Sequence, residues 1–270
     1  MSALALIELS IADLCLAALL VLLNAGVSIA LKLDLGRRLL VAALRATVQL
    51  ALLGLLLRWI FDVEGPWAVL AMMLAMALVA GFEAVRRTSR RVPGIWAASM
   101  GVMLVSSLLV TFYGLTAVID VPGAWYSPQY AIPILGMILG NTLTGISLGL
   151  ETSLEGFVLE RERVEMLLAH GASRREASLD VVQRSVRRGM VPILNSMMAV
   201  GIISIPGMMT GQILAGEEPA AAARYQLFIL FAIAGGVALG TVGVVLASVR
   251  LVFDDRDRLR LDRVRNVEPR

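Results

Sequence analysis

The sequence of 270 residues contains one cysteine, Cys15, and one histidine, His170. One cysteine excludes an internal disulfide and a cysteine-held metal cluster, and one histidine excludes a zinc site built from histidines. Charged residues make up only 17% and aromatic residues 6%, whereas hydrophobic residues reach 58% and the mean hydropathy is +0.81. Water-soluble domains are about a quarter charged. The composition therefore predicts an integral membrane protein, and its long apolar blocks favour helices over an alternating β-barrel.

Seven blocks are long enough to cross a bilayer, which takes about 20 helical residues. They predict an all-α membrane protein with one transmembrane domain over residues 1–270. The expected spans lie near 9–31, 39–60, 66–82, 94–119, 129–150, 190–214 and 225–252. No Lys or Arg precedes the first block, so we expect it to stay as a membrane helix and not to be removed as a signal peptide.

Basic residues gather on alternate loops. They follow the first span (Lys32, Arg37, Arg38) and the third (Arg86, Arg87, Arg90, Arg91). Seven arginines lie in residues 151–189, and seven more lie from Arg250 to Arg270, six of them in the charged tail, 253–270. The positive-inside rule then predicts an amino terminus outside and a carboxyl terminus in the cytoplasm. We expect a multi-pass protein of the inner (plasma) membrane.

Residues 151–189 form the one long loop between expected spans, and they read as two cytoplasmic helices that meet at an elbow between spans 5 and 6. Gly171 suits the left-handed backbone position that ends a helix. Ser173, followed three residues later by Glu176, is the signature of a capping box that begins the next helix. Arg161 and Glu165 lie one turn apart and can pair.

Within this elbow, Glu165, Ala169 and Gly171 follow the pattern Glu-x-x-x-Ala-x-Gly. The pattern is similar to the EAA loop of ABC-transporter permeases, although Met166 and Leu167 stand where its consensus has alanine. The likeness implies that this segment is a coupling helix that docks on an ATPase subunit. The implied coupling residues are Glu165, Ala169, Gly171, Ser173 and Glu176.

Three longer stretches carry a sharper resemblance. They are YAIPILGMILGNTLTGISLGLE from Tyr130, RGMVPILNSMMAVGIISIPGMMTGQILAG from Arg188 and ARYQLFILFAIAGGVALGT from Ala223. They resemble the FetB-type permeases, the membrane subunits of iron-export ABC systems, whose plant relatives are tied to aluminium tolerance. The resemblance implies a permease without its own ATPase, and the sequence has no G-x-x-x-x-G-K-[ST] phosphate loop.

Polar residues inside the first two spans are functional candidates because ionisable groups are costly in a membrane. They are Asp13, Asn24, Arg45 and Gln49. One interpretation is a polar seam near a transport pathway. The other is a buried Arg45 that Asn24 and further polar groups hold, which would lock two helices together.

Spans 5 and 6 carry the pathway candidates. Pro133, Pro192 and Pro206 each lack a backbone donor, and Gly136 with Gly140 and Gly207 with Gly211 predict close helix contacts. Methionines supply soft thioether ligands or ordinary core packing. The candidates are Asn141, Thr144, Asn195, Ser196, Met197, Met198, Pro206, Gly207, Met208, Met209 and Gln212.

We therefore expect a permease homodimer in membrane lipid, coupled to two copies of a cytoplasmic ABC ATPase, that exports a metal cation such as iron. The chain itself is expected to bind no cofactor and no nucleic acid and to catalyse no reaction. ATP-Mg is expected on the partner subunit, and the sequence does not identify the residues that bind the metal. One alternative is an organic solute such as a nucleotide sugar, since the spans lack an acidic cluster. Others are an intramembrane lipid-modifying enzyme and a regulatory subunit without a pathway.

Overall fold

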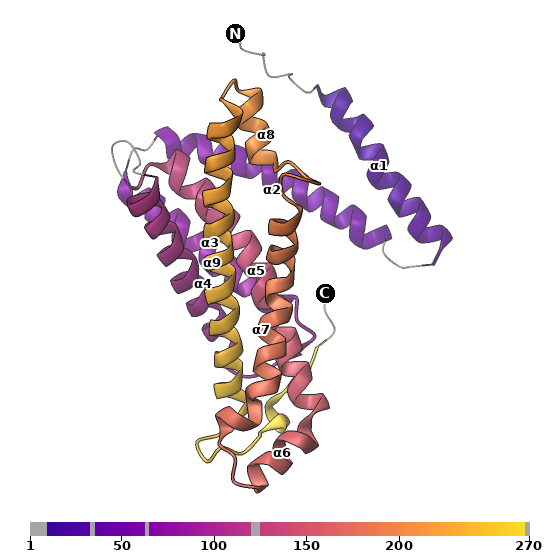
Figure 1. Cartoon of the computed structure of the whole chain (residues 1–270). Helices are drawn as coiled ribbons and strands as arrows, with labels where there is room; N and C mark the ends of the chain where they lie inside the picture. The colour runs from indigo at the N-terminus through magenta and orange to yellow at the C-terminus, as the bar shows by residue number, and fades with distance from the viewer. Residues whose placement is uncertain (1–9, 33–35, 63–64, 120–124, 268–270) are drawn as a thin grey trace. The chain divides into compact units, whose positions relative to one another are not determined.

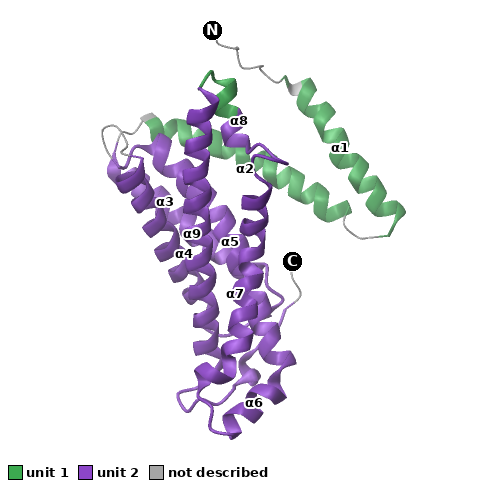
Figure 2. Cartoon of the chain, viewed as in Figure 1, with its two compact units in different colours: residues 1–64, 211–217 green, residues 65–210, 218–270 purple. Residues whose placement is uncertain are grey.

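The computed structural model describes residues 10–32, 36–62, 65–119 and 125–267 (Figure 1). Residue 9 of the first expected span and residues 268–270 of the expected tail lie outside the described residues. The chain divides into two compact units, residues 1–64 with 211–217, and residues 65–210 with 218–270 (Figure 2). Each unit is described by itself.

Six helices of the described chain are long and apolar enough to cross a membrane. They are α1 (Ile11–Ala30), α2 (Gly36–Asp62), α3 (Pro66–Arg86), α4 (Ile95–Tyr113), α5 (Pro128–Leu159) and α9 (Pro219–Val252). A π-helical turn over Gly114–Val118 continues α4. These helices overlap six of the seven expected spans, so the expected mainly helical membrane fold is confirmed.

In the first unit, α1 packs against α2. Their contact lies near the connection between them, where Ala25 and Ser28 are buried and a Cβ at Gly36 would lie 3.4 Å from the Ala25 carbonyl oxygen. Asp13 has a local role. Its carboxylate accepts hydrogen bonds from the Ser10 backbone (2.9 Å) and hydroxyl (2.7 Å), which caps the first turn of α1.

The interpretation of Arg45 as a buried residue is wrong. The side chains of Arg45, Asn24 and Gln49 are all exposed in the described chain. The physical reason is that the small residues of α1 and α2 meet close to their connection, whereas these polar positions fall on faces that this packing does not cover.

In the second unit, α5 lies against α3, α7 (Arg174–Ala199) and α9, and α4 packs on α3 and α9. Closeness between α5, α7 and α9 depends on glycine. A Cβ added at Gly145 would lie 2.7 Å from the Thr241 hydroxyl, and one at Gly240 would lie 2.5 Å from the Thr142 methyl. At Gly189 it would lie 2.7 Å from the Gly145 carbonyl oxygen. Backbones approach this closely only where side chains are absent.

The glycines that make close helix contacts are not the ones predicted from the sequence. No described atom lies within 4 Å of a Cβ added at Gly140, Gly207 or Gly211, and at Gly136 the neighbour is the end of the flexible Met76 side chain, at 3.5 Å. The spacing of glycines marks a smooth helix face, but the partner helix decides which of several such faces is used.

The expected span near 190–214 is not one helix. It comprises the end of α7, a break at residues 200–206 and the short helix α8 (Gly207–Leu214). Gly201 has a left-handed φ of +82°, and its N–H donates to the Ser204 carbonyl (2.9 Å) in a tight turn. Pro206 has no N–H with which to continue a helix. Pro192, in contrast, lies inside α7, which remains continuous.

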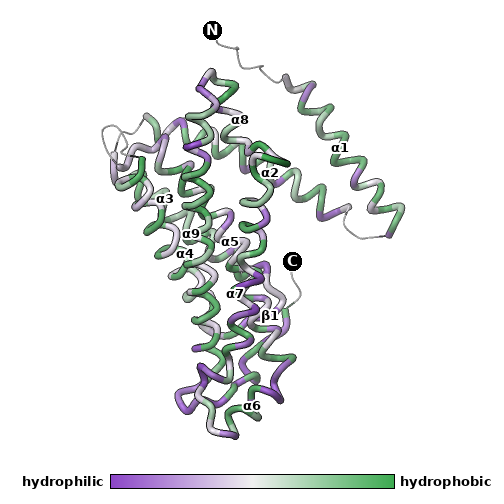
Figure 3. Tube along the Cα trace, in the orientation of Figure 1, coloured by the Kyte–Doolittle hydropathy of each residue, from purple (hydrophilic) through white to green (hydrophobic). Residues whose placement is uncertain are grey.

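The expected boundaries of the 151–189 loop also fall inside helices. α5 continues to Leu159, the separate helix α6 covers Arg161–Ala169, and α7 begins at Arg174. Figure 3 shows hydrophilic residues along the first part of α7 and hydrophobic residues along most of α9. The single helix α7 thus begins with a polar segment and continues into a more apolar one.

The charged tail is structured over its described residues. After α9 it forms a turn around Asp254, a 3₁₀ turn (Leu261–Arg263) and β2 (Arg265–Asn266). β2 pairs antiparallel with β1 (Arg90–Arg91) in the α3–α4 connection. Val267 also donates its N–H to the Ser89 carbonyl (2.8 Å), and Ser89 donates both its N–H and its hydroxyl to Glu151 of α5.

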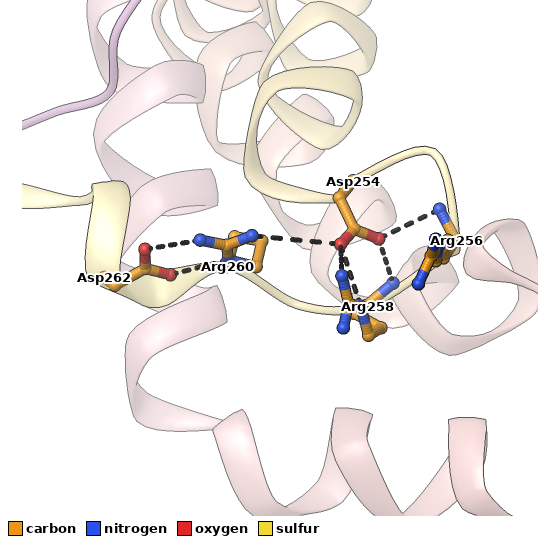
Figure 4. Close-up of polar contacts among 5 residues, drawn as sticks. All are labelled: Asp254, Arg256, Arg258, Arg260 and Asp262. Carbon is orange, nitrogen blue, oxygen red and sulfur yellow. Dashed lines mark hydrogen bonds and ion pairs between the residues drawn. The ribbon is translucent and has the colours of Figure 1, made fainter.

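Figure 4 shows the Asp254 carboxylate surrounded by arginines of the tail. It accepts hydrogen bonds of 2.9 Å from the N–H groups of Arg256 and Arg258 and from Nε of Arg258. The backbone bond from Arg258 is the main cause that lowers the pKa of Asp254 to about 2. Arg260 lies 3.9 Å from Asp254 and pairs with Asp262 at 2.9 Å.

Candidate functional site

A cavity of about 490 Å³ lies in the second unit, beside the carboxyl end of α7. Residues of α5, α7, the 200–206 break and α9 line it. Its polar lining consists of Asn141, Asn195, Ser196, Ser204 and Gln226, and its apolar lining consists of Ile193, Ala199, Val200, Pro206, Leu230 and Ile233. No carboxylate of the described residues lines this cavity.

Two of its polar side chains are oriented by their own helices. The amide of Asn141 donates to the Met137 carbonyl (2.9 Å), which leaves the side-chain oxygen of Asn141 as an acceptor. The Ser196 hydroxyl donates to the Pro192 carbonyl (3.0 Å), so its lone pairs remain available. Both residues therefore present oxygen atoms that can bind a cation or accept a hydrogen bond.

Gln226 on α9 was missed by the sequence-based prediction. Its side chain is 7% exposed, and its Oε1 has no hydrogen-bond partner among the described residues. A buried polar atom without a partner costs about 1–3 kcal/mol, and a ligand in the cavity would remove that cost. The available signal was a single amide in the apolar run that begins at Tyr225.

The structure brings together four of the eleven predicted pathway residues, Asn141, Asn195, Ser196 and Pro206. The cavity lining does not include Thr144, whose hydroxyl donates to the Gly140 carbonyl. It also does not include Met197, Met198, Gly207, Met208 or Met209, and Gln212 belongs to the first unit. The candidate methionine ligands thus do not line this cavity: Met197 and Met198 lie in the last turn of α7, and Met208 and Met209 lie in α8 beyond the break.

A metal centre of charged ligands is not formed within the described chain. There is no group of three or more His, Cys, Asp or Glu side chains that could hold a metal ion. Any cation in the cavity would meet amide, hydroxyl and backbone oxygen atoms instead.

At the other end of α7 the predicted helix junction is present. Gly171 has a φ of +90°, and its N–H donates to the Leu168 carbonyl while the Ala172 N–H donates to that of Leu167 (both 3.0 Å). These two bonds make the Schellman motif that ends α6. The predicted left-handed conformation of Gly171 at the end of a helix is confirmed.

The predicted capping box is also confirmed. The Ser173 hydroxyl accepts from the Glu176 N–H (3.4 Å), and the Glu176 carboxylate accepts from the Ser173 hydroxyl (2.7 Å) and N–H (2.8 Å). Donation by the Ser173 hydroxyl, and then by its N–H, lowers the pKa of Glu176. The box fixes the direction in which α7 leaves the junction.

Glu165 pairs with Arg161 at 2.9 Å, as predicted, and Ala169 is exposed one turn later. Glu165 also lines a hollow of about 400 Å³ together with tail residues 256–259. Arg174 at the start of α7 pairs with Asp257 of the tail (3.5 Å). The tail is therefore part of the surface around the α6–α7 junction, which the sequence-based prediction did not include.

Residues 11–253 match UPF0014, an uncharacterised protein family. The chain belongs to this family. The UPF0014 match contains every residue of the cavity, both α6 and α7, and only the first residue of the tail. It confirms the family expected from the sequence resemblance.

Among curated UPF0014 relatives, membrane protein slr1647 of Synechocystis is 36% identical, over 94% of this chain and 98% of that protein. The probable iron export permease protein FetB of Escherichia coli is 28% identical, over 92% of this chain and 93% of that protein. Protein ALUMINUM SENSITIVE 3 of Arabidopsis thaliana is 32% identical, over 84% of this chain and 81% of that protein. No solved structure matches the chain.

Proposed function

We propose that this UPF0014 protein is the permease subunit of an ABC transporter, which exports a metal cation such as iron with energy from a separate ATPase subunit. The observation that carries the proposal is the continuity of α7. One helix joins the capped α6–α7 junction to Asn195 and Ser196 in the cavity, a distance of about 30 Å at 1.5 Å per residue. A movement of the junction would be transmitted to the cavity.

The proposed coupling residues are those of the junction, Glu165, Ala169, Gly171, Ser173 and Glu176. All five are exposed and thus accessible to a partner protein. The proposed orientation follows from the arginines, with the junction and tail in the cytoplasm and the protein in the inner membrane. Two permease copies and two ATPase copies with ATP-Mg would make the transporter.

Iron as the cargo is supported by the name of the Escherichia coli relative, a probable iron export permease. The oxygen atoms of Asn141, Ser196 and Gln226 suit a hard cation. The lack of a carboxylate in the lining supports the second candidate, an organic solute such as a nucleotide sugar, because amides and hydroxyls also bind neutral polar groups.

The test is transport into vesicles that contain the permease and its ATPase, with a panel of metal ions and a nucleotide sugar. We expect ATP-dependent movement of iron that falls about tenfold or more in Gln226→Leu, because the variant lacks the unpaired oxygen. The exposed neighbour Leu227 provides the control Leu227→Ala, which should transport normally. Movement of the sugar alone would reverse the choice of cargo, and ATPase binding without any transport would indicate a regulatory subunit.

A further inference from the structure

The first part of the tail, which follows α9, is held as a fixed loop beside the α6–α7 junction. Phe253 is buried, and the centroid of its ring lies 5.8 Å from that of Phe157 on α5. The Arg260 N–H donates to the Val252 carbonyl (2.8 Å) at the end of α9. The chain therefore returns to α9 and closes a loop over residues 254–259.

Two further contacts hold this loop in place. The Asp254 carboxylate accepts hydrogen bonds from the N–H groups of Arg256 and Arg258 (both 2.9 Å), as Figure 4 shows. Asp257 pairs with Arg174, the first residue of α7, at 3.5 Å. The loop is thus anchored to α7 as well as to α9, and it forms one wall of the hollow of about 400 Å³ described above.

The hollow has an apolar part and one charge without a partner. Its lining comes from the junction and from the tail: Glu165, Leu168, Ala172, Arg256, Asp257, Arg258 and Leu259. Leu168 and Leu259 are half-buried and supply the apolar part. Glu165 pairs with Arg161. Arg256 is exposed, and no carboxylate of the described residues lies within 4.0 Å of its guanidinium.

We propose that residues 256–259 belong to the surface on which the ATPase subunit docks. The hollow takes an apolar side chain of that subunit, and an acidic neighbour of this side chain lies against Arg256. The inference rests on the proposed function, which assigns Glu165 to ATPase coupling. Because Glu165 and the tail line the same hollow, a partner that reaches Glu165 also meets the tail. An apolar anchor in a preformed pocket, with complementary charge beside it, is a common way to hold an interface.

The position of the tail distinguishes a docking wall from an autoinhibitory cover. With the tail in place, all five proposed coupling residues remain exposed. The loop therefore borders the junction and leaves it accessible to a partner. A change at Arg256 should for this reason weaken the binding of the ATPase, whereas the loss of a cover would strengthen it.

The first test locates the ATPase by crosslinking in cells that produce the full-length protein. The photoreactive residue p-benzoylphenylalanine replaces Glu165 in one variant and Arg256 in another, and mass spectrometry identifies each adduct. We expect both positions to capture the same protein, one that contains a G-x-x-x-x-G-K-[ST] phosphate loop. Capture of that protein from Glu165 alone would overturn the role of the tail and leave the proposed function intact. Capture from neither position would overturn both.

The second test measures the Kd of the captured ATPase for the purified permease in detergent. Arg256→Glu should raise this Kd about tenfold, because it places like charges together. Arg256→Lys retains the charge and should bind nearly as the original protein does. Arg263→Glu is the matched control, because Arg263 is also exposed in the tail but lines a different hollow. An equal loss in the control, or unchanged or tighter binding by Arg256→Glu, would overturn the proposal.

Discussion

Thr142 on α5 and Thr241 on α9 occupy reciprocal positions, each against two glycines spaced four residues apart on the other helix. Cβ atoms added at Gly236 and Gly240 would lie 3.0 and 2.5 Å from Thr142, and those added at Gly145 and Gly149 would lie 2.7 and 2.8 Å from Thr241. Both threonines are fully buried. This double contact sets the register of α5 against α9 and so fixes Asn141 relative to Gln226.

The first prediction concerns this packing. Gly189→Ala places a methyl group 2.7 Å from the Gly145 carbonyl oxygen and 2.5 Å from Thr241, and neither backbone can move alone. We expect the free energy of unfolding to fall by about 1–3 kcal/mol, the usual cost of overpacking. The measurement is the unfolding temperature in detergent, which should be lower. Gly140→Ala, where no described atom lies within 4 Å of the new Cβ, is the control; equal stability of the two variants would contradict the packing argument.

The second prediction separates backbone conformation from contact at Gly171. No described atom lies within 4 Å of a Cβ there, yet φ is +90°. Gly171→Val should misdirect α6 and α7 and abolish ATPase stimulation, while Gly171→Asn should retain most of it, because Asn tolerates this region. Ser173→Ala should cost only about 1 kcal/mol of capping. The measurement is the rate of ATP hydrolysis by the reconstituted transporter with each of the three variants. Unchanged ATPase stimulation in Gly171→Val would refute the role of the junction.

The third prediction is a pH dependence of the tail. Folding lowers the pKa of Asp254 from 3.8 to about 2, so its stabilising contribution is complete above pH 3.8 and is lost as the pH falls through about 2. Amide hydrogen exchange over residues 254–260 should therefore show protection at pH 5 that disappears near pH 2. Asp254→Asn should lack this protection even at pH 7. The adjacent Asp255→Asn is the matched control, and a similar loss there would show that the turn depends on total charge.

The fourth prediction is the orientation of the junction. In a Cys15→Ser background, Ser173→Cys should react with a membrane-impermeant thiol reagent only after cells are opened, because the arginine-rich loops are expected inside. Ser173 is exposed in the structure, and labelling after the cells are opened is the positive control that the reagent reaches this position. Labelling of intact cells would place the junction outside and remove the basis for coupling.

The features that could be predicted from the sequence are local ones. In a membrane, the backbone N–H and C=O groups of a long apolar run can pair only within a helix. Six spans could therefore be placed from the sequence. The junction could be placed to the residue, because Gly171, Ser173 and Glu176 satisfy backbone groups within a few positions of themselves.

The missed features depend on distant partners. Nothing near Gly236 in the sequence indicates that Thr142 will pack against it. Of the glycines predicted instead, only Gly136 has a neighbour within 4 Å of an added Cβ, the end of the Met76 side chain. Gln226 could have been found from its lone amide, but its importance appears only when α5 and α7 enclose it. The break at 200–206 was missed because apolar residues such as Ile202 and Ile203 hide a turn that Gly201 and Pro206 impose.

The pairing of β1 with β2 has a consequence for the order of events during biosynthesis. Arg90 and Arg91 leave the ribosome long before Arg265 and Asn266, with which they pair. At about 5–20 residues per second, the interval is on the order of ten seconds. β1 in the α3–α4 connection therefore stays without its partner strand while α5 to α9 are synthesised. Pairing of β1 with β2 is thus a late step in maturation. A nascent chain interrupted within the tail would expose the unpaired edge of β1 to proteolytic quality control.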